Sequence, residues 1–247
     1  MGDSNKGGRS PLMEDHVVTF RTYLNKTVLT ALEWMPYIYL AHVVVSLPQL
    51  GIWRRTKVSK ASILSSRRAL HEAVAREVAN EKILYLEFGV YQGDSIKYWA
   101  QLNSNPSSRF VGFDTFTGLP ELWQRNFAIV KQNEFDTGGA LPVINDDRCS
   151  FEVGLFQRTL RPFLKMLDRT QYDRVVIHLD ADLYSATLFA LCECDEILRS
   201  NDFLIFDEFS NIFNEFRALT DWARAYGRDY EVVQLTRWAN QTAIRVT

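Results

Sequence analysis

From residue 82 onward, short apolar runs alternate with segments whose apolar residues recur at helical spacing. Four runs have the length and composition of buried strands: "ILYLEFGV", "RFVGFDTF", "RVVIHLDADL" and "DFLIFDEFS". Helical patterns such as "SIKYWAQLN", "SATLFALCECDEILRS" and "NEFRALTDWARAYG" follow three of these runs. Strands that alternate with helices predict an α/β fold with a doubly wound parallel sheet. The last two runs, "YEVVQLT" and "TAIRVT", have no helix between them, which indicates an antiparallel hairpin at the sheet edge.

The first third of the chain has a different pattern. Residues 1–14 are rich in polar residues and glycine and are predicted to be a disordered tail. Residues 15–80 read as helical and are expected to form a cap, a lid or a dimer segment. In its last helix, Leu70, Val74 and Val78 form one stripe, and Ser66 is placed to cap the start. Residues 81–247 are expected to form the core domain.

The segment 28–53 is the most apolar part of that first third. Its run "YIYLAHVVVSL" is bracketed by Pro36 and Pro48 and is too short for a membrane span, which needs about 20 residues. One interpretation is a buried helix or a contact in a homo-oligomer. The other is a surface that touches lipid or an apolar substrate, with the interfacial aromatic residues Trp34, Tyr37, Tyr39 and Trp53.

Composition and charge narrow the class of protein. The chain has 247 residues, of which 47% are hydrophobic, so it can bury a core. Its formal net charge is −2 and its basic residues form no long run, which argues against a nucleic-acid footprint. Three cysteines are too few for a disulfide framework. This pattern fits a reducing compartment, and a cytoplasmic location is expected.

Polar residues gather where the predicted strands end. Glu87 with Gly89 and Gly93 follows the first strand, Asp114 the second, Asp180 with Asp182 a third, and Asp207 with Glu208 a fourth. Ligands of such sheets bind at the carboxyl ends of the strands. Several acids at one edge repel one another unless a cationic ligand or a metal neutralises them.

The glycine spacing separates two kinds of ligand. A dinucleotide site favours G-x-G-x-x-G, whereas Gly89 and Gly93 give G-x-x-x-G after Glu87. An acid at that point repels phosphate and suits a positively charged amino acid. The glycines could also form an ordinary strand-to-helix turn, and Asp114 could hold ribose hydroxyls or simply stabilise a turn.

Four segments, "LEFGVYQGDS", "VGFDTFTGLPELW", "HLDADLYSAT" and "LIFDEFS", occur in this order. Together they resemble class I S-adenosylmethionine-dependent methyltransferases, specifically the macrocin O-methyltransferase family, from about Leu84 to the C-terminus. The resemblance implies a Rossmann-like seven-stranded sheet whose last strand is antiparallel. It also implies S-adenosylmethionine (SAM) as methyl donor and a divalent metal, usually Mg²⁺.

The resemblance also assigns residues to roles. The metal ligands it implies are Asp180, Asp207 and Glu208, and the catalytic residues are Asp180 and Glu208. It places the adenine near Phe116 and, more loosely, near the loop that carries Asp147 and Arg148. The full donor-binding set that it implies is Glu87, Phe88, Gly89, Gly93, Ser95, Asp114, Thr115, Phe116, Asp147 and Asp180.

Some positions leave alternatives open. Relatives tend to carry Asp-Asp or Asp-Asn where this chain has Asp207-Glu208, so Glu208 could ligate the metal, act as a base, or mark a weakened metal site. His178 reads as a core histidine, or as a residue that supports the site or contacts the substrate. Glu134 and Asp136 are the candidates for a base in the loop 118–147.

The sequence therefore predicts a SAM-dependent, Mg²⁺-dependent O-methyltransferase. Its acceptor would be a hydroxyl of a sugar, a glycoside or a natural-product-like small molecule. The main alternative is a methyltransferase-like scaffold with little or no catalysis. A dinucleotide-dependent oxidoreductase is the third reading, and the glycine spacing and Glu87 argue against it.

Overall fold

The computed structural model describes residues 38–58, 60–124, 129–130 and 134–247. The chain divides into two compact units, residues 1–45 and 46–247. The predicted disordered tail and the aromatic residues Trp34 and Tyr37 lie outside the described residues. Everything below on packing and on the site concerns the unit 46–247.

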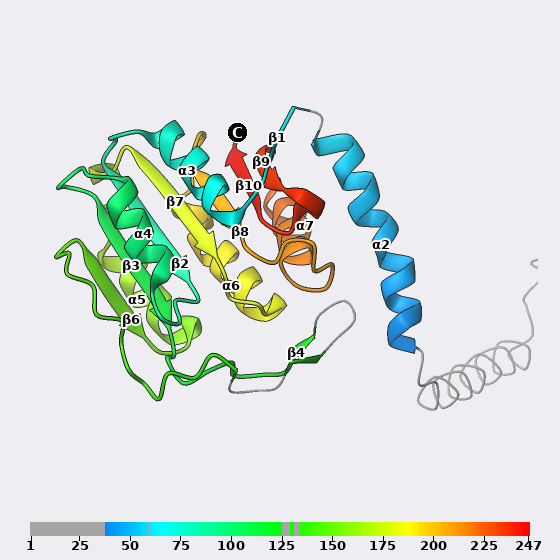
Figure 1. The fold of residues 1–247 in the computed structure, drawn as a ribbon, viewed down its shortest axis with the longest axis horizontal. Helices are drawn as coiled ribbons and strands as arrows, with labels where there is room; N and C mark the ends of the chain where they lie inside the picture. Colours follow the sequence, from blue (N-terminus) through cyan, green and yellow to red (C-terminus); the bar gives the residue numbers. More distant parts are fainter. Residues whose placement is uncertain (1–37, 59, 125–128, 131–133) are drawn as a thin grey trace, which may run out of the picture. The chain divides into compact units, whose positions relative to one another are not determined.

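An eight-stranded sheet with the order β1-β9-β10-β8-β7-β2-β3-β6 organises this unit (Figure 1). Every neighbouring pair is parallel except the two pairs that β10 makes with β8 and β9. This arrangement confirms the α/β prediction and the antiparallel last strand. The strands are β1 (Ser62–Leu64), β2 (Ile83–Phe88), β3 (Arg109–Asp114), β6 (Cys149–Val153), β7 (Arg174–Leu179), β8 (Phe203–Phe206), β9 (Tyr230–Thr236) and β10 (Thr242–Val246), while β4 (Trp123–Gln124) and β5 (Ile129–Val130) form a separate pair.

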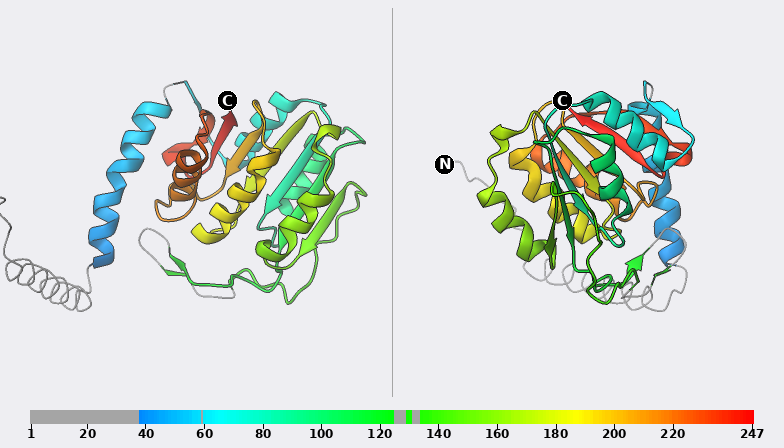
Figure 2. Two further views of the ribbon diagram at one scale, coloured as in Figure 1. Left: turned by 180° about the vertical axis from the view of Figure 1, so that it is seen from behind. Right: turned by 60° about the vertical axis from the view of Figure 1, so that its left-hand side comes forward.

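Helices cover both faces of the sheet, as the two views of Figure 2 show. On one face lie α3 (Arg67–Val78) and α4 (Asp94–Leu102), and on the other lie α5 (Phe156–Met166), α6 (Tyr184–Cys194) and α7 (Glu215–Tyr226). Short 3-10 turns occur at Arg169–Gln171, Asp195–Ile197 and Arg237–Ala239. Because both faces are covered, β2 and β8 are buried at every position.

Helix α3 is joined to the core as its pattern predicts. The side chain of Ser66 accepts a hydrogen bond from the backbone N–H of Ala69, so it caps the helix. Leu70, Val74 and Val78 are fully buried. At about 1.5–3 kcal/mol for each large side chain removed from water, this stripe is enough to fix the helix on the sheet.

Two details differ from the sequence-based expectation. Residues 62–64 form a strand, β1, inside the segment that was predicted to be helical, and Ser62 pairs with Gln234 of β9. A three-residue strand is too short to show a period of its own, and the pairing with β9 determines its structure. Because β1 lies beside β9, the hairpin of β9 and β10 is not at the bare edge of the sheet.

In helix α2 (Ile38–Lys57), residues 46–57 belong to the unit 46–247. The indole N–H of Trp53 donates to the hydroxyl of Tyr230 at 2.9 Å, and its ring lies 4.8 Å from that of Phe209. Trp53 is therefore a core side chain and not an interfacial one, whereas Leu47 and Ile52 are exposed. Within the described residues, no helix has both the length and the apolar character needed to span a membrane.

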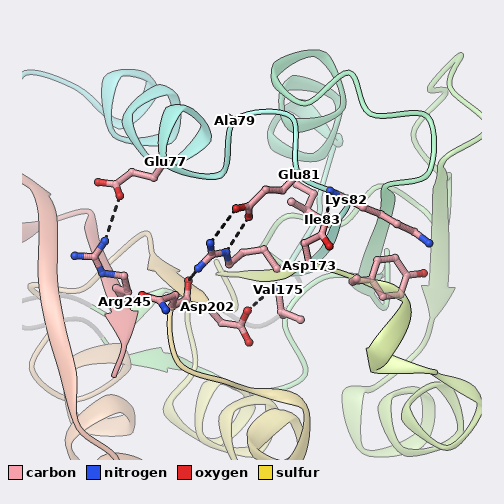
Figure 3. A network of polar contacts seen from close by, with 12 residues as sticks. Glu77, Ala79, Glu81, Lys82, Ile83, Asp173, Val175, Asp202 and Arg245 are labelled. Carbon is pink, nitrogen blue, oxygen red and sulfur yellow. Dashed lines mark hydrogen bonds and ion pairs between the residues drawn. The ribbon is translucent and has the colours of Figure 1, made fainter.

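The amino ends of the strands carry a network of ion pairs (Figure 3). Arg174 at the start of β7 pairs with Glu81 at 2.9 Å, and Arg169 pairs with the buried Asp202 at 2.9 Å. Asp202 also accepts a hydrogen bond from the backbone N–H of Val175. Arg245 on β10 contacts Glu77 of α3 at 3.2 Å. At this edge, buried charges have partners of opposite sign.

Candidate functional site

The opposite edge of the sheet, where β2, β3, β7 and β8 end, opens into a cavity of about 360 Å³. Five acids and a single basic side chain, Arg67, are found among the described residues that line it. Leu119, Trp123, Phe135 and Leu155 make a largely apolar wall. The acids are Asp114, Asp180, Asp182, Asp207 and Glu208. The strand-end residues predicted from the sequence therefore do converge, and they converge with an excess of negative charge.

The glycine turn after β2 depends on the absence of side chains. Gly89 has φ +90°, and a Cβ there would lie 2.0 Å from the carbonyl oxygen of Asp180. Gly93 has φ +79°, precedes the first residue of α4, and would bring a Cβ to 2.7 Å from Pro142. Both positions require a left-handed backbone and a close approach that only glycine allows. The turn thereby brings the ends of β2 and β7 together at the cavity.

Glu87 lies beneath the cavity and does not line it. The Tyr85 hydroxyl donates to its carboxylate at 2.5 Å, and Nδ1 of His178 is 3.3 Å from the same oxygen. All three side chains are buried. Burial raises the pKa of Glu87 to about 8, against the effect of the hydrogen bond from Tyr85. Burial also lowers the pKa of His178 to about 3, so His178 is a neutral core histidine that holds the Tyr85 hydroxyl at 3.0 Å.

Asp114 at the end of β3 holds the glycine turn in place. Its carboxylate accepts hydrogen bonds from the backbone N–H groups of Val90 at 2.7 Å, Tyr91 at 2.9 Å and Phe116 at 2.8 Å. It thus has the turn-stabilising role that the sequence left open, and it lines the cavity beside Thr115. A carboxylate has about four acceptor positions, so it still has capacity to accept a bond from a ligand.

The acids at the ends of β7 and β8 meet around Arg67. Its Nη2 lies 2.7 Å from Oδ2 of Asp180, and its Nε lies 2.8 Å from Oδ1 of Asp207. Burial and repulsion from Asp180 raise the pKa of Asp207 to about 8, and burial also raises the pKa of Asp180. Although its own partial burial works against its charge, these two acids raise the pKa of Arg67. The guanidinium is therefore a fixed positive charge within this group of acids.

The donor atoms fit a divalent cation. Ligand atoms of His178, Asp180 and Asp207 lie within 4.8 Å of one another, and carboxylate oxygens are the ligands that Mg²⁺ prefers. Oδ1 of Asp207 is in ion-pair contact with Arg67 but accepts no aligned hydrogen bond. Glu208 lines the same cavity but does not join this group of three. The arrangement can hold one positive charge between Asp180 and Asp207, and Arg67 now provides it.

The remaining predicted residues lie around this centre. Ser95 accepts a hydrogen bond from Arg67 at 2.8 Å. Phe88 and Phe116 are fully buried in the core rather than exposed in the cavity, and Phe116 packs edge-on against Phe151. Asp147 is exposed, and the neighbouring Arg148 pairs with Asp146 at 2.7 Å. Glu134 and Asp136 are exposed and do not line the cavity.

Sequence reasoning missed two residues of the site, Arg67 and Glu215. Arg67 begins α3, a helix that the sequence assigned to a cap, and its spacing from the strand ends gives no signal. Glu215 begins α7 and is fully buried, and it accepts a hydrogen bond from the backbone N–H of Glu208 at 2.9 Å. Burial and repulsion from Asp207 raise its pKa well above the ordinary range. An acid at the start of a helix after an acidic strand end is a weak signal that could have identified Glu215.

Solved methyltransferases have a similar fold. CalS11, described as a calicheamicin methyltransferase, superposes with a TM-score of 0.55 at 20% identity, and the match covers 99% of each chain. An apo structure of CalS11, described as a TDP-rhamnose 3'-O-methyltransferase of calicheamicin biosynthesis, gives 0.52 at 20% identity over 96% of each chain. The O-methyltransferase NovP gives 0.55 at 17% identity over 73% of this chain and 79% of its own.

At these identities the similarity establishes the fold and not the activity. The sequence matches no known protein family, and no curated protein is significantly similar to it. The fold is the Rossmann-like methyltransferase fold that the sequence predicted.

Proposed function

We propose that this chain is a SAM-dependent methyltransferase that methylates a hydroxyl group of a small molecule. The observation that carries the proposal is the convergence of four strand ends on one cavity where the described lining residues include five acids and a single arginine. Such a site favours a ligand that carries positive charge, and SAM has both a sulfonium and an ammonium group. The fold shared with CalS11 and NovP supports the same reading.

The donor would lie along the ends of β2 and β3. Gly89 and Gly93 let the backbone approach its methionine end, with Ser95 beside them, and Glu87 supplies buried negative charge beneath. Asp114 and Thr115 would contact the ribose. Phe88 and Phe116 would act from within the core, by supporting the turn, and the loop of Asp147 would lie toward the adenine.

Asp180 and Asp207 would hold Mg²⁺, with Glu208 beside them. When bound, such a cation lowers the pKa of a hydroxyl that it coordinates. The chain's own contribution is to orient the acceptor, to exclude water with the apolar wall, and to take up the hydroxyl proton. Asp180 and Glu208 are the carboxylates at the cavity that would accept this proton.

The acceptor would combine a hydroxyl group with an apolar portion. Leu119, Trp123 and Phe135 offer apolar surface in the wall of the cavity. A sugar, a glycoside or a similar natural product matches this combination. The description of CalS11 as a TDP-rhamnose 3'-O-methyltransferase supports a sugar-containing acceptor.

The N-terminal segment 15–80 would serve this activity as a cap, lid or dimer segment, in a cytoplasmic enzyme that can be a homo-oligomer. Trp53 belongs to the core, so a truncation that tests this role should end before Ser46 rather than at Ser59. The truncated chain is expected to bind SAM and to lose acceptor binding or self-association. Unchanged acceptor binding and oligomeric state would contradict that role.

The test is a calorimetric titration of SAM into the purified protein with Mg²⁺ present. Micromolar binding is expected, and Asp180→Asn should weaken it by about tenfold or more, equivalent to 1.4 kcal/mol per factor of ten. Asp229→Asn is the matched control, because Asp229 is an exposed residue just before β9 and does not line this cavity. Absence of SAM binding to folded protein would overturn the proposal, and saturable NADH binding in its place would favour an oxidoreductase.

A second candidate function is a scaffold that binds the donor without catalysis. The position of Arg67 across Asp180 and Asp207 favours it, because a guanidinium there blocks a metal. Transfer of labelled methyl from SAM to a panel of sugars, nucleotide sugars, glycosides and phenols separates the two. SAM binding with no transfer to any acceptor, with or without Mg²⁺, would support the scaffold.

A further inference from the structure

Arg67 makes three polar contacts at the carboxyl edge of the sheet. Its Nη2 contacts Asp180 at 2.7 Å and the Ser95 hydroxyl at 2.8 Å, and its Nε contacts Asp207 at 2.8 Å. The two carboxylates come from different strands, β7 and β8. One guanidinium therefore joins the ends of two neighbouring strands to the start of α4.

The location of Arg67 in its own helix is unfavourable by itself. It is the first residue of α3, where the partial positive charge of the helix N-terminus disfavours a cation. Its side chain is also only 41% exposed, so it has lost part of its hydration. The two acids compensate for both effects, which shows that Arg67 is held by the site and not by its helix.

The oxygens that hold Arg67 are also the oxygens that would hold a metal. Guanidinium nitrogens lie 2.7 and 2.8 Å from Oδ2 of Asp180 and Oδ1 of Asp207. A Mg²⁺ ion bonds to such oxygens at about 2.0–2.1 Å and would have to enter the same space. The arginine and a metal bridging these two oxygens cannot be present together.

We propose that Arg67 is an internal cation that competes with a divalent metal for Asp180 and Asp207, so that the metal binds there only when the arginine withdraws. This inference deepens the proposed function, because the metal concerned is the one that the methyltransferase would use. It makes Arg67 a residue that controls loading of the site.

The structure provides a place for the withdrawn side chain. A second cavity of about 400 Å³ lies between α3 and α4, and Arg67 borders it together with Asp94 and Ser95 and with two further cations, Arg68 and Lys97. The partly exposed side chain can turn toward this cavity without unfolding α3. Asp94, which lines that cavity, offers a carboxylate to the displaced guanidinium.

The experiment measures Mn²⁺ binding, by electron paramagnetic resonance and calorimetry, to the metal-free full chain. Arg67→Gln should bind Mn²⁺ at least about tenfold more tightly than the wild type, because it removes a competing charge from the two carboxylates. Arg76→Gln is the matched control, since Arg76 is an exposed residue in the last turn of the same helix and borders neither cavity, and it should bind like the wild type. Arg67→Lys, which keeps the charge but cannot contact both acids with a fork of nitrogens, should be intermediate.

Thermal unfolding gives a second readout. In chelator, Arg67→Gln should melt below the wild type, because Asp180 and Asp207 lose their cation. Added Mn²⁺ should raise its melting temperature more than that of the wild type. Equal Mn²⁺ affinity of wild type and Arg67→Gln within about twofold, weaker binding by the variant, or no binding by either would overturn the inference.

Titration of SAM into the same samples separates this inference from the proposed function. Tighter Mn²⁺ binding by Arg67→Gln without any SAM binding would support the role of Arg67 as an internal cation and contradict the proposed methyltransferase function. SAM binding by the wild type, together with equal Mn²⁺ affinities of the wild type and Arg67→Gln, would support the proposed methyltransferase function and contradict the role of Arg67 as an internal cation.

Discussion

The two edges of the sheet differ in how their buried acids are neutralised. At the amino edge, Asp202 is paired with Arg169. Glu81, which Figure 3 labels, is paired with Arg174. At the carboxyl edge, five acids line a cavity with Arg67 alone among the described basic residues, and Glu87 and Glu215 lie buried behind it.

The difference separates charge that stabilises the fold from charge that is kept for a ligand. A matched buried pair repays part of its desolvation cost through its own contact, whereas unmatched acids raise each other's pKa. The pKa of Glu87 and that of Asp207 are both raised to about 8. Strongly shifted groups of this kind are typical of functional sites. A cationic ligand would reduce the repulsion between the acids at the carboxyl edge, whereas the buried acids at the amino edge are already paired with arginines.

The largest expected effect comes from breaking a matched pair. The side chains of Arg169 and Asp202 are 8% and 1% exposed. Asp202→Asn removes the negative charge that pairs with the buried Arg169, and it should lower the free energy of unfolding by about 3–5 kcal/mol. Urea unfolding at pH 7 measures the loss. Asp207→Asn, the same substitution at the carboxyl edge, should change the free energy by less than about 1 kcal/mol. Equal losses at the two edges would contradict the comparison.

The next effect concerns the buried acid Glu215. Burial and repulsion from Asp207 raise its pKa well above the ordinary value and so disfavour its charge, and Glu215→Gln, which keeps a neutral acceptor at this position, should lower the free energy of unfolding less than a substitution that removes the acceptor. Glu215→Leu should lose about 1–3 kcal/mol, because the backbone N–H of Glu208 then has no acceptor. Thermal and urea unfolding of the two variants provide the test. A large loss in the glutamine variant would show that the charged form of Glu215 is needed.

The third effect is a dependence of stability on pH. Glu87 holds its proton in the folded chain up to a pKa of about 8 but loses it near 4.5 when unfolded, so stability falls as the pH rises through this range. Below pH 6.5 the buried His178, whose pKa is lowered to about 3, acts in the opposite direction. Between pH 6.5 and 8 the decline in stability comes from the buried acids with raised pKa values. Each of them lowers the free energy of unfolding by at most about 1.4 kcal/mol per pH unit.

Glu87→Gln isolates this contribution. The wild type should lose up to about 2 kcal/mol more than the variant between pH 6.5 and 8, as measured by urea unfolding at both values. Asp207 continues to titrate in the variant, so a smaller decline should remain. Identical declines of the free energy of unfolding in the two proteins would show that Glu87 does not contribute to this pH dependence.

The smallest effect lies at the exposed part of the amino edge. Glu77→Gln removes a contact of 3.2 Å between side chains that are 37% and 29% exposed, and Arg245 keeps Glu231 at 2.8 Å. The loss should be below about 1 kcal/mol and should shrink further in high salt. A loss as large as that of Asp202→Asn would mean that burial does not control the strength of these pairs.

Much of the fold followed from the local pattern. The runs ending at Phe88, Leu179 and Phe206 are strands because both faces of the sheet are covered, and this leaves a continuous apolar signal. The stripe of Leu70, Val74 and Val78 likewise predicted a buried helix face. Strand β1 gave no such signal, because its structure depends on its pairing with β9.

The sequence predicted which strand ends form the candidate site, but not how their side chains lie relative to one another. Glu87, Asp114, Asp180 and Asp207 could be located because the carboxyl ends of parallel strands meet at one edge. The sequence could not show that Glu87 lies beneath the cavity, or that Asp114 accepts three backbone hydrogen bonds. The bond to Phe116 is local, but those to Val90 and Tyr91 join residues 24 and 23 positions apart, and Glu87 meets His178 across 91 positions.

The sequence by itself determined the class of fold, the acidic edge and the glycine turn, because each is recorded in the spacing of neighbouring residues. Only the tertiary structure decided which charge neutralises which acid. Arg67 is 113 residues from Asp180 and belongs to a helix whose pattern reports only its buried face. A guanidinium meets two carboxylates there because α3 packs on the sheet beside the ends of β7 and β8, and no local pattern encodes that packing.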